Sequence, residues 1–207
     1  MAGRSARWPC ALALLALGCH PTPNMRGPRD LDAGYRLALE GLTRSAQVVK
    51  DLNSVMTVHA TMITPEFKRA LTEQYIHIFE VGPDKPDSDL ERVARSQSDG
   101  YEFFVFADLS ERAWNDLDDR DSVWRMTLRG APDQPGITPL RVHRFNGRGP
   151  NVRAFFPYLH GFGRAYLVVF PRVRPDGAPL MDPAHGELLL KLSSVFGSAS
   201  LTWKVSP

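Results

Sequence analysis

Tyr101-Glu102-Phe103-Phe104-Val105-Phe106-Ala107 indicates the architecture of this chain more clearly than any other run of residues. Aromatic and β-branched residues dominate the run, and these residue types favour strands. Its length is typical of a strand and too short for an ordinary helix. Because successive side chains of a strand point to opposite faces, the run predicts a strand with aromatic residues on both faces.

Strand patterns continue from this run to the end of the chain. Apolar residues alternate with polar ones, or form short unbroken runs, over residues 124–129, 140–143, 153–159, 165–170, 187–192 and 199–205. Asn146-Gly147 predicts a tight hairpin turn, after which residues 153–159 pair back as a strand. Pro175-Asp176-Gly177 predicts a further turn.

Both helical and strand patterns occur before residue 101. Apolar residues recur at helical spacing over residues 31–51, and Asp30 is placed to cap this helix. Residues 56–62 alternate between apolar and polar types, which predicts a half-buried strand.

A second helix is predicted over residues 65–80. Thr64 is suited to cap its first turn, and Gly82-Pro83 is expected to end it. A short helix near residues 88–97 follows, because Ser88 begins a sequence of capping-box form.

Together these patterns predict one α+β domain over residues 30–207. The strands are typical of an antiparallel β-sandwich of about seven or eight strands, with two or three helices in the N-terminal portion. The helices at 31–51 and 65–80 carry apolar stripes that need a partner, so we expect them to cover the second face of the strand at 101–107. Otherwise that face offers aromatic side chains to a ligand or a partner protein: Tyr101, Phe103, Phe156 or Tyr158.

The first residues of the chain have the organisation of a secretory signal. Arg4 and Arg7 form a basic region, and residues 11–17 form a short apolar one. The apolar run is too short to cross a bilayer, which takes about 20 residues. Leu15-Ala16-Leu17-Gly18-Cys19 resembles the lipobox of bacterial lipoproteins. It departs from the commonest pattern, in which Leu takes the place of Ala16 and a small residue the place of Leu17.

The lipobox resemblance implies that residues 1–18 are a signal peptide, cut before Cys19. It also implies that the Cys19 sulfur carries a diacylglyceryl group, and two or more acyl chains anchor a protein stably. Residues 19–29 are rich in Pro and Gly and are expected to form an extended tether. In a Gram-negative cell, His20 after the cysteine, rather than Asp, implies outer-membrane sorting with the domain facing the periplasm. An ordinary signal peptide and a soluble secreted protein are the alternative.

Charge and cysteine content exclude several classes of function. Removing residues 1–18 removes Arg4, Arg7 and no acid, so 23 of the 25 basic side chains remain against 23 acidic ones. No global positive charge is left to bind nucleic acid or an anionic membrane surface. Cys10 lies in the signal and Cys19 is the expected anchor. The domain would therefore have no thiol for a disulfide scaffold, a zinc site or a cysteine nucleophile.

Residues 114–124 hold the densest group of acidic side chains. Asp116, Asp118 and Asp121, with Asn115, could offer oxygen ligands to calcium. The sequence lacks the glycine and the distal glutamate of an EF-hand loop, and Arg120 opposes a cation. We therefore favour a loop whose aspartates form turns and caps, with Trp114 and Trp124 packed on the core.

Motifs for metal binding or catalysis are not recognisable in the sequence. The histidines His20, His59, His77, His143, His160 and His185 include no His-x-x-x-His pair, so solvated or locally hydrogen-bonded histidines are expected. No Gly-x-Ser-x-Gly elbow occurs, and Ser193-Ser194 lies in a strand-like run. Gly161-Phe162-Gly163 is best explained as a hairpin turn between two strands, because it lacks the helix and Lys of a phosphate loop. No cofactor is expected.

Three short motifs carry a second resemblance. Trp114-Asn115-Asp116-Leu117, Asp121-Ser122-x-Trp124 and Phe155-Phe156-Pro157 are similar to uncharacterised sandwich-domain lipoproteins of Gram-negative bacteria. The resemblance covers the predicted domain and implies a location in the cell envelope, without implying a particular activity.

The first hypothesis is a non-enzymatic, membrane-tethered periplasmic module for envelope assembly, for example in a secretion machine of the type VI kind. Its expected partners are the membrane, through lipid on Cys19, and another envelope protein. One alternative is a carbohydrate- or small-ligand-binding sandwich, which needs exposed aromatics in a cleft. A weaker one is a hydrolase, which needs a buried His–carboxylate or Ser–His pair. An assembly component needs an exposed apolar face or edge strand instead.

Overall fold

The computed structural model describes residues 31–80, 89–94, 98–146, 150–181 and 186–205. The predicted signal, tether and lipid anchor, together with Asp30, Gly82-Pro83, Ser88, Gly147 and His185, lie outside these residues.

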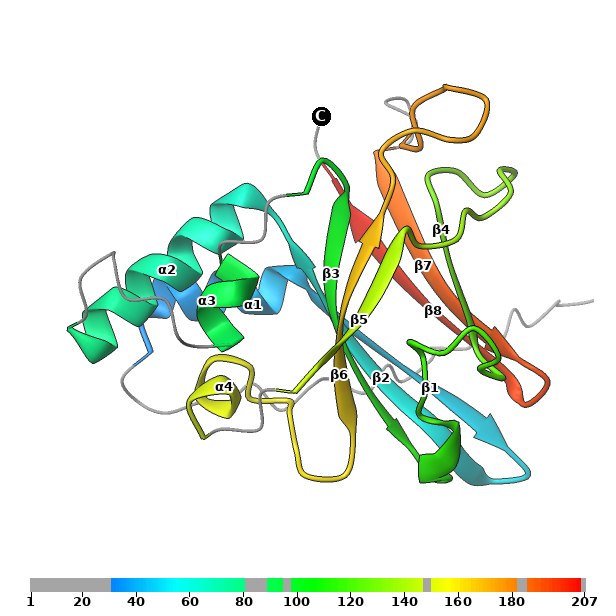
Figure 1. Cartoon of the computed structure of the whole chain (residues 1–207), viewed down its shortest axis with the longest axis horizontal. Helices are drawn as coiled ribbons and strands as arrows, with labels where there is room; N and C mark the ends of the chain where they lie inside the picture. Colours follow the sequence, from blue (N-terminus) through cyan, green and yellow to red (C-terminus); the bar gives the residue numbers. More distant parts are fainter. Residues whose placement is uncertain (1–30, 81–88, 95–97, 147–149, 182–185, 206–207) are drawn as a thin grey trace, which may run out of the picture.

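The strands form two antiparallel sheets (Figure 1). The larger sheet has five strands in the order β1 (Thr43–Lys50), β2 (Asn53–Ile63), β3 (Tyr101–Leu109), β6 (Arg164–Phe170) and β5 (Arg141–Phe145). The smaller sheet has three strands in the order β4 (Arg125–Arg129), β7 (Glu187–Ser194) and β8 (Gly197–Lys204). The helices are α1 (Ala33–Leu42), α2 (Pro65–Phe79), α3 (Asp89–Ala94) and α4 (Pro150–Phe155), with a short 3₁₀ turn η1 (Arg112–Trp114) after β3. The predicted α+β sandwich is confirmed.

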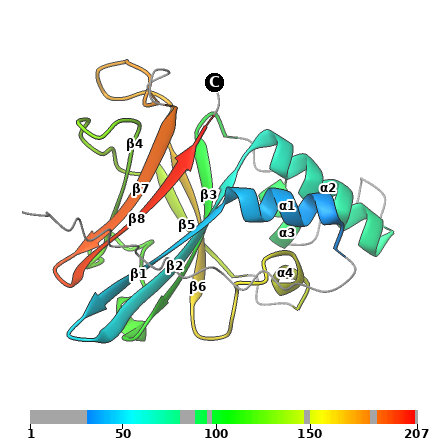
Figure 2. The same ribbon diagram turned by 180° about the vertical axis from the view of Figure 1, so that it is seen from behind.

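The domain has three layers. The smaller sheet covers one face of the larger sheet, and all four helices lie on the other side, as both views show (Figures 1 and 2). Each boundary between layers holds its own cluster of buried apolar side chains. The middle strands β2, β3 and β6 are therefore buried on both faces over most of their length, whereas the edge strands β1 and β5 keep exposed residues.

The run that indicated the architecture forms β3, in the middle of the larger sheet between β2 and β6. Phe103 and Val105 point into the cluster between the two sheets, whereas Phe104 and Phe106 point into the cluster beneath the helices. All four are 2 % exposed or less. Burial of one Phe side chain stabilises the fold by about 1.5–3 kcal/mol, so β3 anchors both cores.

Helices cover the second face of β3, as expected. Tyr35 and Leu39 of α1, and Phe67 and Leu71 of α2, lie in the same buried cluster as Phe104. Thr64 caps α2 as predicted, because its side chain accepts a hydrogen bond from the Phe67 N–H.

The helix predicted over residues 31–51 is wrong in its second half. The helix ends at Leu42, and residues 43–50 form β1, an edge strand paired with β2. Ala46 and Val48 are buried at strand spacing, while Val49, which the helical pattern needs inside, is 55 % exposed. The cap is Asp32, whose side chain accepts from the N–H groups of Gly34 and Tyr35.

The strand predicted over residues 153–159 is also wrong. Pro150–Phe155 is the helix α4, and β5 pairs with β6 instead. Val152, Phe155 and Phe156 are buried together, at the spacing of one helix face. Gly161-Phe162-Gly163 therefore does not join two strands, because α4 and irregular backbone precede it and β6 follows.

Two hydrogen bonds close one corner of the sandwich. The indole N–H of Trp203 on β8 donates to the Leu42 carbonyl at 2.7 Å, and Nε of Arg44 on β1 donates to the Thr202 carbonyl at 3.0 Å. The edge strands of the two sheets are thereby held together without a shared ladder.

Candidate functional site

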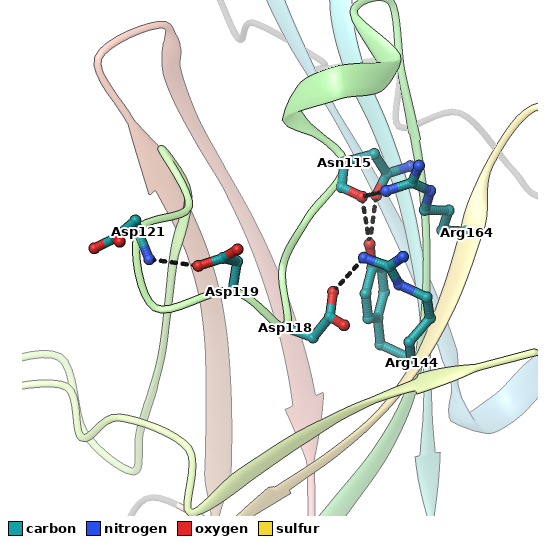
Figure 3. A network of polar contacts seen from close by, with 7 residues as sticks. Asn115, Asp118, Asp119, Asp121, Arg144 and Arg164 are labelled. Carbon is teal, nitrogen blue, oxygen red and sulfur yellow. Dashed lines mark hydrogen bonds and ion pairs between the residues drawn. The ribbon is translucent and has the colours of Figure 1, made fainter.

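The acidic loop that follows η1 is bonded to the larger sheet, and we call this loop with its contacts the clamp. The Asp118 carboxylate accepts from Arg144 of β5 at 2.8 Å, and the Asp119 carboxylate accepts from the Asp121 N–H at 2.9 Å (Figure 3). The hydrogen bond from Arg144 to Asp118 raises the pKa of the guanidinium further above its ordinary value. The Asp118 carboxylate is thus used in an ion pair and that of Asp119 in a turn, whereas Oδ1 of Asp116 is buried and has no hydrogen-bond partner among the described residues. No group of three or more potential ligand residues that could hold a metal ion occurs within the described residues.

Asn115 lies at the centre of this clamp. Its side-chain amide donates to the Ala107 carbonyl on β3 at 2.8 Å. Its side-chain oxygen accepts from the Tyr166 hydroxyl on β6 at 2.9 Å, and its main-chain oxygen accepts from Arg164 as well (Figure 3). Asn115 is 2 % exposed, so these bonds hold the loop firmly on the larger sheet.

Trp114 and Trp124 pack on the core, as the sequence predicted for this loop. Trp124 is 2 % exposed, and Trp114 is partly buried against the same cluster. This cluster lies between the two sheets. The acidic loop therefore covers part of the core between them.

A chain of buried hydroxyl groups crosses the helix side of the larger sheet. The Thr43 hydroxyl donates to the Leu39 carbonyl at 2.7 Å and lies 2.8 Å from the Thr61 hydroxyl, which lies 2.7 Å from that of Tyr158. Since each hydroxyl has one proton, Thr61 donates to Thr43 and Tyr158 donates to Thr61. Burial raises the pKa of the Tyr158 hydroxyl well above its ordinary value, in keeping with this donor role.

His59 lies beside this chain and is buried, contrary to the expectation of a solvated histidine. Its ring stacks on that of Tyr158 at 5.3 Å and on that of Phe106 at 6.3 Å. Its Nδ1 atom is buried and has no hydrogen-bond partner among the described residues. Burial, and to a smaller extent the nearby His160, lowers the pKa of His59 to about 4, so the ring is neutral near pH 7.

The remaining described histidines match the expectation. His77 and His143 are exposed, on α2 and on β5. Nε2 of His160 is 3.6 Å from an Asp108 carboxylate oxygen, and both side chains are about a third exposed or more. The His160–Asp108 contact is therefore partly solvated. A hydrolase site was expected to contain a buried His–carboxylate pair instead.

The aromatic residues considered as a ligand surface are used inside the protein. Phe103, Phe156 and Tyr158 are buried, and Tyr101 is partly covered by the Arg172 guanidinium, 5.0 Å from its ring centre.

Exposed apolar side chains gather instead at one end of the sandwich, which we call the hairpin end: Val49, Leu52 and Val195, with the partly buried Trp114 and Phe196 beside them. Leu52 is 99 % exposed and Val195 is 85 % exposed, at the tips of the β1–β2 and β7–β8 hairpins. Phe196 stacks on Trp114 at 4.5 Å between ring centres, and Lys50 lies 5.5 Å from the Phe196 ring. Both views place the two hairpin tips at the same end (Figures 1 and 2).

Leu52 has an unusual backbone conformation. Asp51 and Leu52 have φ values of 49° and 64°, in the left-handed region. A tight two-residue hairpin of this kind favours Asn-Gly or Asp-Gly, and a leucine in this region costs about 1–2 kcal/mol. Sequence reasoning missed the hairpin end because it placed residues 43–50 in a helix. A strand pattern there would have put Asp51-Leu52 at a turn.

The fold and these contacts define a three-layer α+β protein built on a β-sandwich. No family model matches the sequence, and no curated protein or solved structure matches it significantly. Among the described residues, no helix has the length and apolar character needed to cross a membrane.

Proposed function

We propose that this chain is a lipid-anchored protein of the cell envelope whose domain acts without catalysis, by docking another envelope protein on the hairpin end. Lipid on Cys19 would attach it to the outer membrane, and residues 19–29 would tether the domain. The proposal joins the lipobox of the sequence to the apolar surface of the fold.

Leu52 is the observation that carries the docking function. Its side chain is almost wholly exposed, so it stabilises no part of the described domain, and its backbone conformation disfavours leucine. Val195 projects nearby without burial. Apolar residues that project together from one end of a domain are typical of contact sites.

The charges around the hairpin end favour a protein over an anionic bilayer as the partner. Lys50 and Arg112 are basic, whereas Asp51 and Glu111 are acidic, and all four are exposed. Mixed charges around an apolar centre are typical of the rim of a protein interface, and they provide no net attraction to anionic lipid.

Photo-crosslinking in intact cells tests the docking surface. A crosslinking residue at position 52 or 195 should capture one and the same envelope protein, and the same residue at Leu37 should not. Leu37 is a matched control because it is also apolar and 69 % exposed, but it lies on α1, in the helical layer. The purified partner should then bind the wild-type protein, and Leu52→Ser with Val195→Ser should abolish binding.

Several outcomes would overturn the docking proposal. These are equal capture at position 37, crosslinks only to lipid or to a second copy of the chain, and undiminished binding by the double variant. The anchor is tested separately: Cys19→Ala should abolish lipid labelling and membrane association, and unchanged labelling and association would disprove it.

A further inference from the structure

A hollow lined by cationic side chains lies at the start of β6. It has a volume of about 200 Å³, and its polar lining includes Arg144 of β5, Arg153 of α4, Arg164 of β6 and His160. None of the described residues that line it carries a carboxylate. The three arginines come from three successive elements, β5, α4 and β6, and the fold of this part of the chain brings their guanidinium groups to one hollow.

The clamp described above positions two of the three guanidinium groups. Arg144 is held by Asp118, and Arg164 donates to the main-chain oxygen of the buried Asn115 (Figure 3). Each guanidinium has further N–H groups beyond the one used in its bond. The Nε atom of Arg144 is buried and has no hydrogen-bond partner among the described residues.

Arg153 supplies a third group, which the fold itself does not use. It is exposed, and no hydrogen bond or ion pair joins it to another described residue. Its Nη2 atom would lie 3.8 Å from a Cβ atom built on Gly161, so the guanidinium is close to the loop before β6. Asp118 offsets the charge of Arg144, so Arg153 and Arg164 leave a net positive charge at the hollow, which attracts an anion.

The loop before β6 lies in close contact with β3 at Gly163. A Cβ atom on Gly163 would come within 2.2 Å of the Phe106 ring and 2.7 Å of the Ala107 carbonyl oxygen. Only glycine therefore allows this loop to lie directly on β3. The aromatic rings of Phe106 and Phe145 form part of the wall, and such apolar walls strengthen electrostatic attraction inside the hollow.

We propose that this hollow binds the phosphoryl group of a small anionic molecule. Guanidinium groups match the oxygens of phosphate in geometry and charge, and several of them suit a dianion better than a carboxylate. The volume is below the range of about 300–1,000 Å³ typical of sites for drug-sized ligands, so it fits a phosphoryl group better than a large molecule. A phosphoryl group on a free metabolite or on a lipid headgroup has the same chemistry.

Calorimetric titration of the full-length protein with inorganic phosphate, at constant ionic strength, tests the site. We expect a Kd of about 1 mM or below, since three charge-assisted contacts contribute. Arg153→Gln should weaken binding roughly tenfold, because it removes one such contact and no contact of the described fold. Arg36→Gln, which removes an exposed arginine of α1, is the matched control and should bind as the wild type does.

One further variant and a vesicle-binding assay identify the source of the phosphoryl group and define the results that would overturn the proposal. Arg164→Lys keeps the charge but loses the forked donor, and should also weaken phosphate binding. Retention on phosphatidate vesicles that is lost in Arg153→Gln assigns a lipid phosphoryl group, whereas phosphate binding without such retention assigns a free one. Absence of binding to both probes overturns the site. Equal binding by wild type and Arg153→Gln does so too, since the anion then lies elsewhere.

Discussion

The Tyr166 hydroxyl lies 2.8 Å from the main-chain oxygen of Asn115 and 2.9 Å from the side-chain oxygen of the same residue. Tyr166 is fully buried on β6, and the Asn115 amide donates to Ala107 on the neighbouring strand β3. One loop residue is thus fixed to two strands of the larger sheet. The loop carries Asp118, so the same contact also helps to place Arg144.

We expect Tyr166→Phe to lower the free energy of unfolding by about 1–3 kcal/mol, because it leaves the Asn115 side-chain oxygen buried without that donor. Urea denaturation followed by tryptophan fluorescence measures the change. Tyr75→Phe is the matched control, since no hydrogen bond of the Tyr75 hydroxyl to a described residue is seen and its ring contacts remain. A loss in Tyr166→Phe no greater than that in the control would contradict the role of this contact.

The direction of donation along the buried hydroxyl chain predicts which of two substitutions destabilises the fold more. Thr61 both accepts from Tyr158 and donates to Thr43, so Thr61→Val leaves two hydroxyl groups short of a partner. Tyr158→Phe removes only the terminal donor. We therefore expect Thr61→Val to lower the free energy of unfolding by about 2–3 kcal/mol and Tyr158→Phe by about 1 kcal/mol. Urea denaturation would contradict the assigned direction if Tyr158→Phe were the more destabilising variant.

Local signals in the sequence predicted those elements whose residues favour only one structure. The aromatic run of β3 suits a buried strand, and Thr64 with Pro65 suits the start of α2. The strand β1 was missed because the position of Ala46 fits the spacing of a helix and that of a strand equally well. The helix α4 was missed because it is a single short piece, of six residues, next to a turn signal.

Features that depend on packing could not be predicted from local patterns. His59 alternates with apolar residues, which indicates a polar face, yet Phe106 and the segment around Tyr158 cover the His59 ring. The cationic hollow requires Arg144, Arg153 and Arg164 to meet from three segments. No spacing rule of a single helix or strand connects them, because one lies on β5, one on α4 and one on β6, and β5 pairs with β6.

His59 makes the stability of the fold sensitive to acid. Its pKa is about 4 in the folded protein and 6.5 as an ordinary histidine, so the unfolded chain binds a proton first as the pH falls. The stability that the neutral His59 ring contributes is therefore fully present above about pH 6.5. It decreases as the pH falls towards 4, and below pH 4 no further stability is lost from this residue. The difference corresponds to about 3 kcal/mol.

The variant His59→Phe tests this pH dependence, because a phenyl ring keeps the stacking on Tyr158 and Phe106 but cannot take up a proton. Urea denaturation at pH 7 and at pH values down to about 4.5 should show a smaller loss of stability in His59→Phe than in the wild type. His143→Phe removes an exposed histidine instead and should retain the wild-type dependence. Identical pH profiles for His59→Phe and the wild type would show that His59 titrates normally.

The backbone at Leu52 predicts that one substitution stabilises the isolated domain while it removes the docking contact. Glycine accepts the left-handed conformation, which relieves about 1–2 kcal/mol, and its greater chain entropy in the unfolded state offsets about 0.5–1 kcal/mol. Leu52→Gly should therefore raise the free energy of unfolding by about 0.5–1 kcal/mol, since no packing is lost from a side chain that is 99 % exposed.

The same substitution on a helix should have the opposite effect, which makes Leu37→Gly the control. Leu37 is exposed in α1, where glycine lowers stability by about 1 kcal/mol. Chemical denaturation of both variants beside the wild type measures the two signs. If Leu52→Gly were destabilised as much as Leu37→Gly, Leu52 would contribute to the stability of the monomer. The hairpin end would then lose its strongest argument as a docking surface, because the exposed leucine would have a structural role.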